Sequence, residues 1–161
     1  EQLRAKNTQV VTGPGEYAMS KVNITGVMTP LTEGESREYR NTAYLIQIDG
    51  TSLCHLGHMK TPLTDSQIDQ LTPTDVLFVP IGTEDVISLS KLSQVIQTMN
   101  PSLIIPMSYS GPDPSGNPPG LNAFLQETGS KGEEPQQRVQ VTPNNLPLEP
   151  RVLTFVSRSV N

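Results

Sequence analysis

The sequence has few of the features that mark several large classes of protein. It contains one cysteine, Cys54, so an internal disulfide framework is excluded, and a reducing compartment suits it. It has no tryptophan, and aromatic residues make up only 4% of its 161 residues. No apolar run is long enough to cross a bilayer, so we expect no membrane span. We therefore expect a cytoplasmic protein with a lean core, of a kind that gains from a partner surface.

Basic residues are also scarce. Eleven Lys and Arg stand against sixteen Asp and Glu, which gives a net charge of −5 and no basic run. This balance argues against a nucleic-acid partner. The first residues, Glu-Gln-Leu-Arg-Ala-Lys, do not have the pattern of a signal peptide, although a signal removed earlier would leave no trace. The length fits one domain, 1–161, and fifteen Pro and twelve Gly indicate many loops.

The segment from Asn41 to Thr64 carries the clearest structural pattern. Apolar residues alternate with period two from Ala43 to Ile48, which indicates a strand. Asp49-Gly50 then supplies the positive φ angles of a two-residue hairpin. The return strand runs over 52–56, and a loop after Gly57 carries His58.

The rest of the chain predicts a mixture of strands and helices. The β-α-β pattern formed by 76–81, 89–99 and 103–107 predicts two buried, parallel strands. The sequence T-D-S-Q at 64–67 is a capping box that opens a short helix. Ser110 to Gly120 is rich in Pro and Gly and predicts a long loop. Further strands are expected at 10–12, 16–19, 22–27 and 152–156, with alternation at Val139 and Val141, and further helices at 65–71 and 121–128.

Several motifs occur in an order that resembles one family. The order is N-T-A-Y-L-I-Q-I-D-G, then C-H-L-G, then P-L-T, with V-T-G-P-G-E-Y at 11–17, N-I-T-G-V at 23–27, D-V-L-F-V-P-I-G at 75–82 and I-I-P-M-S-Y at 104–109. This pattern resembles the metallo-β-lactamase-fold hydrolases, in particular their small bacterial branch of zinc-dependent, lactonase-like enzymes. The resemblance implies an α/β fold, the C-terminal portion of an αββα sandwich with mixed sheets. It also implies a domain that lacks the N-terminal metal-binding part, with the strands before 56 placed in a second sheet.

The resemblance also implies where metal ligands should lie. The family holds its metals with an H-x-H-x-D-H loop, a later His, a bridging Asp and a final His, which leave a position open for a hydroxide nucleophile. The loop lies in the family's N-terminal part, and nothing in 1–161 replaces it. No His occurs at Thr29-Pro30-Leu31, His58 stands at the position of the bridging Asp, and Ser108 stands at that of the last His. We therefore expect no catalytic residue, no cofactor and a degenerate metal site.

A small cluster, Cys54, His55 and His58, remains within C-H-L-G-H. One hypothesis is a different, mononuclear zinc site. The other is that His55 is held at a strand end by a hydrogen bond, Cys54 packs as a small hydrophobe and His58 is solvated. We favour the second, because successive strand residues point to opposite faces and three donors lack a fourth.

These observations lead to two functional hypotheses. The first is a non-catalytic, hydrolase-like pseudoenzyme that acts as a structural or protein-interaction subunit. Its partner would be another protein chain or a second copy of itself, because an incomplete sandwich leaves an apolar face to cover and unpaired strand edges. The alternative is a fragment of a metal-dependent hydrolase, with zinc as cofactor and its main ligands in a missing N-terminal part.

Overall fold

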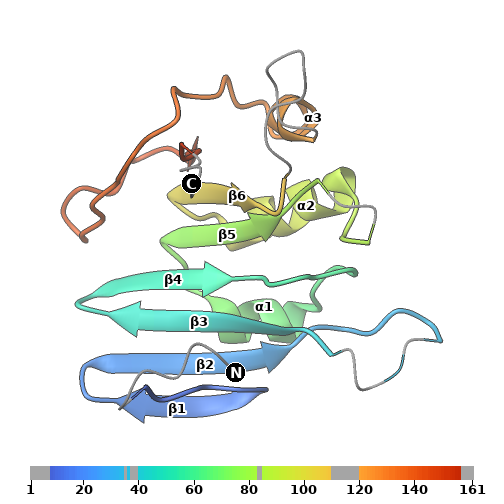
Figure 1. The fold of residues 1–161 in the computed structure, drawn as a ribbon, viewed down its shortest axis with the longest axis vertical. Coiled ribbons are helices and arrows are strands. Elements are labelled where there is room, and N and C mark those ends of the chain that lie inside the picture. The colour runs from blue at the N-terminus through green and yellow to red at the C-terminus, as the bar shows by residue number, and fades with distance from the viewer. Residues whose placement is uncertain (1–7, 35, 37–39, 83–84, 110–119, 157–161) are drawn as a thin grey trace, which may run out of the picture.

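A computed structural model describes residues 8–34, 36, 40–82, 85–109 and 120–156. Its centre is a seven-stranded mixed sheet whose strand order in space, β1 to β7, follows the order in the chain (Figure 1). Neighbours from β1 to β4 are antiparallel, and those from β4 to β7 are parallel. The elements are β1 (Gly15–Met19), β2 (Val22–Met28), β3 (Thr42–Ile48), β4 (Thr51–His55), α1 (Asp65–Leu71), β5 (Val76–Pro80), α2 (Leu89–Met99), β6 (Leu103–Met107), α3 (Leu121–Glu127) and β7 (Arg151–Val152).

The predicted hairpin is present as β3 and β4. Ile48 and Thr51 face each other as the last pair before the turn. The two turn residues have positive φ angles, 48° at Asp49 and 79° at Gly50. Positive φ at both central positions is the geometry that matches the right-handed twist of the flanking strands. The local sequence therefore fixes the register of this hairpin.

The helices also follow their sequence signals. In α1 the Thr64 side chain accepts a hydrogen bond from the Gln67 backbone, and the Gln67 side chain accepts one from the Thr64 backbone, so the capping box is confirmed. The bounds of α2 are those predicted, and its buried residues recur with helical spacing. At the end of α2, Asn100 adopts φ 46° and its N–H bonds to the Ile96 carbonyl.

One face of the sheet is covered by helices, and the main core lies there. In Figure 1 both α1 and α2 lie behind the strands. They pack in the same cluster of buried side chains, to which α3 adds Phe124. Because side chains alternate along a strand, contributors from one strand lie two residues apart, as Ala43 and Leu45 do. The strand residues that contribute are Val27, Ala43, Leu45, Cys54, Leu77, Val79, Ile104 and Val152.

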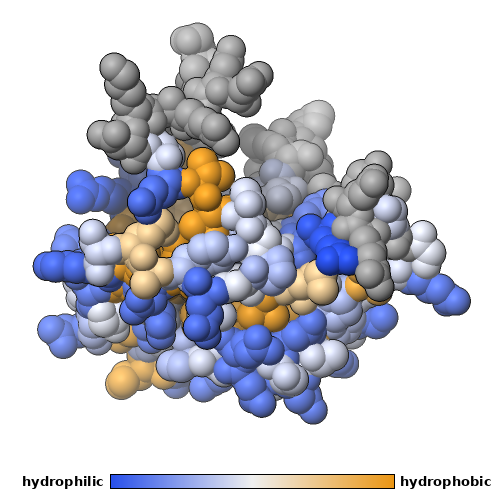
Figure 2. All heavy atoms as spheres, turned by 90° about the horizontal axis from the view of Figure 1, so that it is seen from below, coloured by the Kyte–Doolittle hydropathy of each residue, from blue (hydrophilic) through white to orange (hydrophobic). Residues whose placement is uncertain are grey.

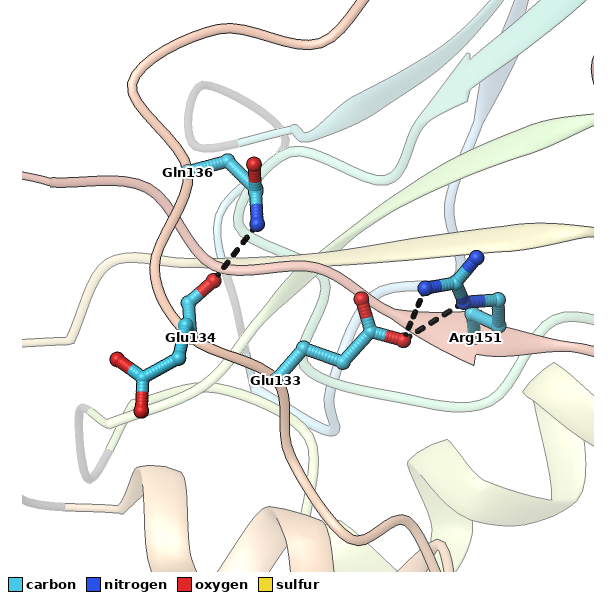
Figure 3. Close-up of polar contacts among 4 residues, drawn as sticks. All are labelled: Glu133, Glu134, Gln136 and Arg151. Atoms are coloured by element: carbon cyan, nitrogen blue, oxygen red, sulfur yellow. Dashed lines mark hydrogen bonds and ion pairs between the residues drawn. The ribbon is translucent and has the colours of Figure 1, made fainter.

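The opposite face carries a second, smaller cluster over β5 and β6, and the C-terminal segment, residues 130–156, packs on it. It consists of Val76, Leu103, Ile105 and Leu153, and the C-terminal segment packs Val141 and Leu146 against it. Polar contacts within the C-terminal segment also hold it in place (Figure 3). The Arg151 Nε donates to Glu133 Oε1 at 2.6 Å, and the Gln136 side chain donates to the Glu134 carbonyl at 3.0 Å. The C-terminal segment thus covers the β5–β6 half of this face.

The expected division into two sheets is wrong for the strands described here. The strands over 16–27 and 43–56 belong to the same sheet as β5 and β6. The ladder continues from β4 into β5, since the Asp75 N–H bonds to the Ser52 carbonyl and the Leu56 N–H bonds to the Phe78 carbonyl, at 2.9 and 3.1 Å. The open edge of β4 therefore takes β5 as its neighbour, and the sheet stays single.

Two predicted strands and one predicted alternation also differ from the structure. Residues 10–12 form no strand; the Tyr17 hydroxyl donates to the Thr12 carbonyl at 3.0 Å. The strand expected over 152–156 changes its neighbour: β7 ends at Val152, and Phe155 instead pairs with Gln136. The alternation over 139–141 gives no strand.

Two remaining expectations concern a loop and the membrane. Of the loop expected over 110–120, residues 110–119 lie outside the described residues, and Gly120 is the N-cap of α3. Within the described ranges, none of the helices has both the length and the apolar character that a membrane crossing requires.

Candidate functional site

The topology gathers the three degenerate ligand positions at one edge of the sheet. Because β2 and β4 are both antiparallel to β3, they run in the same direction, and β5 and β6 run parallel to β4. The C-terminal ends of all four strands therefore meet at the same edge, where ligands bind in open α/β sheets. Thr29 follows β2, His58 follows β4 and Ser108 follows β6. We call the segments that follow these strands the C-terminal edge.

Asn41 holds two of the loops at this edge together. Its Oδ1 accepts from the His58 backbone N–H at 2.8 Å, and its Nδ2 donates to the Leu56 carbonyl at 2.8 Å. The same Nδ2 lies 3.2 Å from Thr29 Oγ1, and the Thr29 N–H donates to the Asn41 carbonyl at 3.0 Å. One side chain thus links the loop after β2 to the loop after β4. Sequence reasoning missed this role, although Asn41 opens the N-T-A-Y motif.

Two longer-range hydrogen bonds strengthen the same connection. The Thr61 hydroxyl donates to the Pro30 carbonyl at 2.8 Å, and the Gln67 side chain donates to the Met28 carbonyl at 2.8 Å. In addition, the Ile87 N–H donates to the Met59 carbonyl at 2.8 Å, which ties the segment before α2 to the loop after β4. The loops are therefore held by uncharged hydrogen bonds between protein groups.

The donors at the C-terminal edge do not fit a zinc ion. Thr29 is buried, and its hydroxyl is already engaged by Asn41. Ser108 is exposed and has φ 62°, and an alcohol is a poor zinc ligand at neutral pH. His58 is exposed and cannot bridge two ions as a carboxylate does. Across the part of the chain that the structure describes, no three His, Cys, Asp or Glu side chains are grouped as a metal would require.

The structure does not bring Cys54, His55 and His58 together as a metal-binding group. Cys54 is buried on the helical face, where burial raises the pKa of its thiol to about 12. His55 points to the opposite face and stacks on Phe78, with ring centroids 5.8 Å apart. Its Nδ1 accepts the Gly57 N–H at 3.0 Å. The residue as a whole is exposed, and partial burial lowers the pKa of its imidazole. Because this contact uses the lone pair of Nδ1, the neutral form of the ring carries its proton on Nε2.

An apolar groove lies on the face opposite the helices, over β2, β3 and β4. Its volume is about 420 Å³. Seen from the β1 side of the molecule, apolar side chains reach the surface between polar ones (Figure 2). No side chain in its lining carries a formal charge when His55 is neutral. The lining residues are Val11, Ile24, Thr42, Tyr44, Ile46, His55 and Gly57.

The groove continues the smaller apolar cluster across the sheet. Leu53 and Phe78 lie between the two and pack against the cluster. Alternation places Ile46, Leu53 and Val76 on the same side of the sheet, since they face one another along the ladder. Half of this face is thus covered by the C-terminal segment, while the β2–β4 half is covered by no helix in the described residues.

Comparison with known protein families finds one match. The sequence profile of the family described as "Beta-lactamase superfamily domain" matches residues 1–108. No curated protein sequence matches the chain.

Solved structures share the fold more widely. A Thermotoga maritima protein, described as a Zn-dependent hydrolase of the metallo-β-lactamase superfamily, has 26% identity and a TM-score of 0.74 over 91% of this chain and 71% of its own. A metal-dependent hydrolase from Parabacteroides distasonis has 12% identity and a TM-score of 0.58, over 92% and 58%. A metallo hydrolase from Ignicoccus hospitalis has 19% identity and a TM-score of 0.55, over 89% and 56%. The chain therefore spans less than two thirds of the last two. The mixed sheet with its helical layer matches the expected metallo-β-lactamase-like α/β fold.

Proposed function

Because the chain belongs to the β-lactamase superfamily, we propose that it is a non-catalytic member that acts as a structural or protein-interaction subunit. The single observation that carries this proposal is the chemistry of the C-terminal edge. Where the resembled hydrolases place a histidine, a carboxylate and a second histidine, this chain places Thr29 to Leu31, His58 and Ser108.

The hydrogen bonds around Asn41 support a metal-free edge. A bound metal ordinarily orders the loops that carry its ligands, and apo sites lose that order. Here the His58 backbone and the Thr29 side chain are both fixed by the Asn41 amide. The loops consequently need no ion to keep their positions.

The apolar groove supports the interaction role. Exposed apolar surface on a soluble domain is typical of a binding site for protein or ligand. Ile24, Tyr44 and Ile46 are only half-buried, and they adjoin a cluster that the chain's own C-terminal segment covers. We propose that further polypeptide covers the groove, either another chain or a preceding part of a longer protein. We further propose a cytoplasmic location, because the single thiol suits a reducing compartment.

Metal analysis of protein purified with zinc in the medium tests the non-catalytic role. The expected result is less than stoichiometric zinc, manganese or iron in wild type, His58→Ala and the control His55→Ala alike. Stoichiometric metal that is lost in His58→Ala but kept in His55→Ala would overturn the proposal, since it would place a ligand at the C-terminal edge.

A hydrophobic fluorescent dye tests the groove. Ile24→Ser with Ile46→Ser should reduce dye binding by the isolated chain, because both side chains line the groove. Ile48→Ser is the matched control, since Ile48 is 39% exposed and lies outside the lining. Equal dye binding by all three proteins would remove the groove from the proposal.

A second candidate function is a fragment of a metal-dependent hydrolase. The similarity to the Thermotoga maritima protein favours it, because this chain spans only 71% of that protein. The full open reading frame distinguishes the two functions. An H-x-H-x-D-H loop upstream, together with metal-dependent hydrolysis by the full-length protein, would support the fragment hypothesis. Absence of that loop would leave the non-catalytic role.

A further inference from the structure

Among the described residues, β1 is a terminal strand of the sheet, and no strand pairs with its outer side. It runs Gly-Glu-Tyr-Ala-Met and has neither a lysine nor a proline, two residues that commonly protect edge strands from pairing. Its side chains at Glu16 and Ala18 are exposed. Among the described residues, the backbone hydrogen bonds outside regular elements include none to either residue. Within the described part of the chain, the outer backbone groups of β1 therefore have no strand partner.

The hairpin register determines which backbone groups this edge offers. Met19 and Val22 close a two-residue turn, so they exchange both of their backbone hydrogen bonds. Bonded pairs alternate along an antiparallel ladder, which directs the N–H and C=O of Tyr17 toward β2 as well. Glu16 and Ala18 consequently direct theirs outward. A neighbouring strand can bond only through these two residues.

We propose that β1 pairs antiparallel with the β1 strand of a second copy of this chain, with Tyr17 on the two-fold axis. In this register Glu16 faces Ala18 of the other copy, and Ala18 faces Glu16. Both residues offer outward-pointing N–H and C=O groups, so each pair exchanges two hydrogen bonds. The strand is thus complementary to itself, as a two-fold interface requires.

Other registers of the same pairing are less favourable. Centring on Glu16 would place two carboxylates directly opposite each other, which is destabilising. Centring on Ala18 would place Glu16 opposite Ser20, a turn residue with φ 54° that does not continue the strand. With Tyr17 at the centre, the two Glu16 side chains are diagonal neighbours about 7–8 Å apart, and they repel each other less than two directly opposed carboxylates would.

The preferred register also places the two Tyr17 residues opposite each other as a non-hydrogen-bonded pair, where side chains lie closest. Tyr17 faces Ile24 across the β1–β2 ladder and so projects on the groove side of the sheet. Aromatic pairs at such positions favour strand association. The dimer would join two seven-stranded sheets into one continuous sheet with both grooves on corresponding faces.

A proline substitution tests the strand edge. Ala18→Pro removes an outward N–H while leaving the bonds between β1 and β2 in place, and Ala18→Ser keeps the N–H as a matched control. In sedimentation experiments, wild type and Ala18→Ser should have twice the chain mass of 17.5 kDa, and Ala18→Pro should have 17.5 kDa, a loss of roughly tenfold or more in dimer affinity. Far-UV circular dichroism should be the same for all three.

A disulfide tests the register independently. Opposite Cα atoms in a non-hydrogen-bonded pair lie about 4.5 Å apart, within the range that a disulfide spans. Tyr17→Cys should therefore form an intermolecular disulfide on mild oxidation, and adding Ala18→Pro should abolish it. Asn23 is an exposed residue of β2 that lies away from the proposed interface, so Asn23→Cys should not cross-link. The natural Cys54 is buried and does not compete.

A wild-type chain that remains monomeric at every concentration tested would overturn the proposal. So would a dimer that persists in Ala18→Pro, or a Tyr17→Cys variant that sediments as a dimer but does not cross-link. The inference rests on the proposed function only for the idea that this domain assembles. Metal content is measured separately, so a zinc-free monomer would remove the β1 dimer alone, and a zinc-containing dimer would remove the non-catalytic role alone.

Discussion

Asn41 and Gly57 are in such close contact that the amide oxygen of Asn41 occupies the space in which any other residue at 57 would carry its Cβ. Gly57 also has φ 62°, a conformation that L side chains rarely adopt. The absence of a side chain at 57 is thus what allows Asn41 to reach the His58 N–H and the Leu56 carbonyl.

Gly57→Ala should therefore destabilise the protein by about 2–4 kcal/mol, from backbone strain plus the displaced Asn41 hydrogen bonds. Gly129→Ala is the matched control, since Gly129 has φ 66° and open space where a Cβ would lie. Gly129→Ala should lower the free energy of unfolding only by the backbone strain, about 1 kcal/mol. Chemical denaturation of both variants gives the comparison, and equal losses would show that contact with Asn41 contributes nothing.

Phe124 should anchor α3. It is the buried residue of that helix and is fully enclosed in the main core. Phe124→Ala should cost about 3–5 kcal/mol, the range for removing a buried aromatic ring. Leu125→Ala, at a half-buried neighbouring position, is the control and should cost less. Thermal unfolding compares them, and similar melting temperatures would contradict this packing.

Alkaline pH should destabilise the fold through Cys54. Burial raises the pKa of this thiol from 9.0 to about 12, so between these values the unfolded chain loses a proton that the folded chain keeps. Stability should therefore fall as pH rises through this window, by at most about 4 kcal/mol. The Cys54→Ala variant should lack this component of the pH profile. Rapid reaction of the native thiol with iodoacetamide at pH 8 would contradict the expected inertness.

Acidic pH should also lower the stability of the fold, through His55. Burial lowers the pKa of its imidazole, so the unfolded chain takes up a proton at a higher pH than the folded chain does. The stability that the neutral ring contributes is complete above the ordinary histidine pKa of about 6.5 and declines as pH falls below it. Denaturation midpoints from pH 7 to 5 measure this trend, and His55→Asn should flatten it. An unchanged slope in that variant would assign the trend to other groups.

Sequence patterns predicted local structure well where one short segment decides the outcome. Asp49-Gly50 fixed a hairpin, and Thr64 with Gln67 fixed a helix start, because the determining contacts lie within a few residues. The division of strands between sheets could not be predicted in this way, since it depends on the pairing of β4 with β5 across an intervening helix. The role of Asn41 depends on contacts 12 to 17 residues away, and the groove depends on which part of one face the C-terminal segment reaches.

Strand order in this sheet has a consequence for how the protein is made. Each strand pairs with the next one in the chain, and short turns separate β1 from β2 and β3 from β4. The β3–β4 hairpin can close within microseconds of leaving the ribosome. The 25 residues between His55 and Pro80, the ends of β4 and β5, take roughly one to five seconds to translate. The antiparallel strands can therefore pair before β5 is synthesised, and the β4 edge stays open for that interval until β5 arrives.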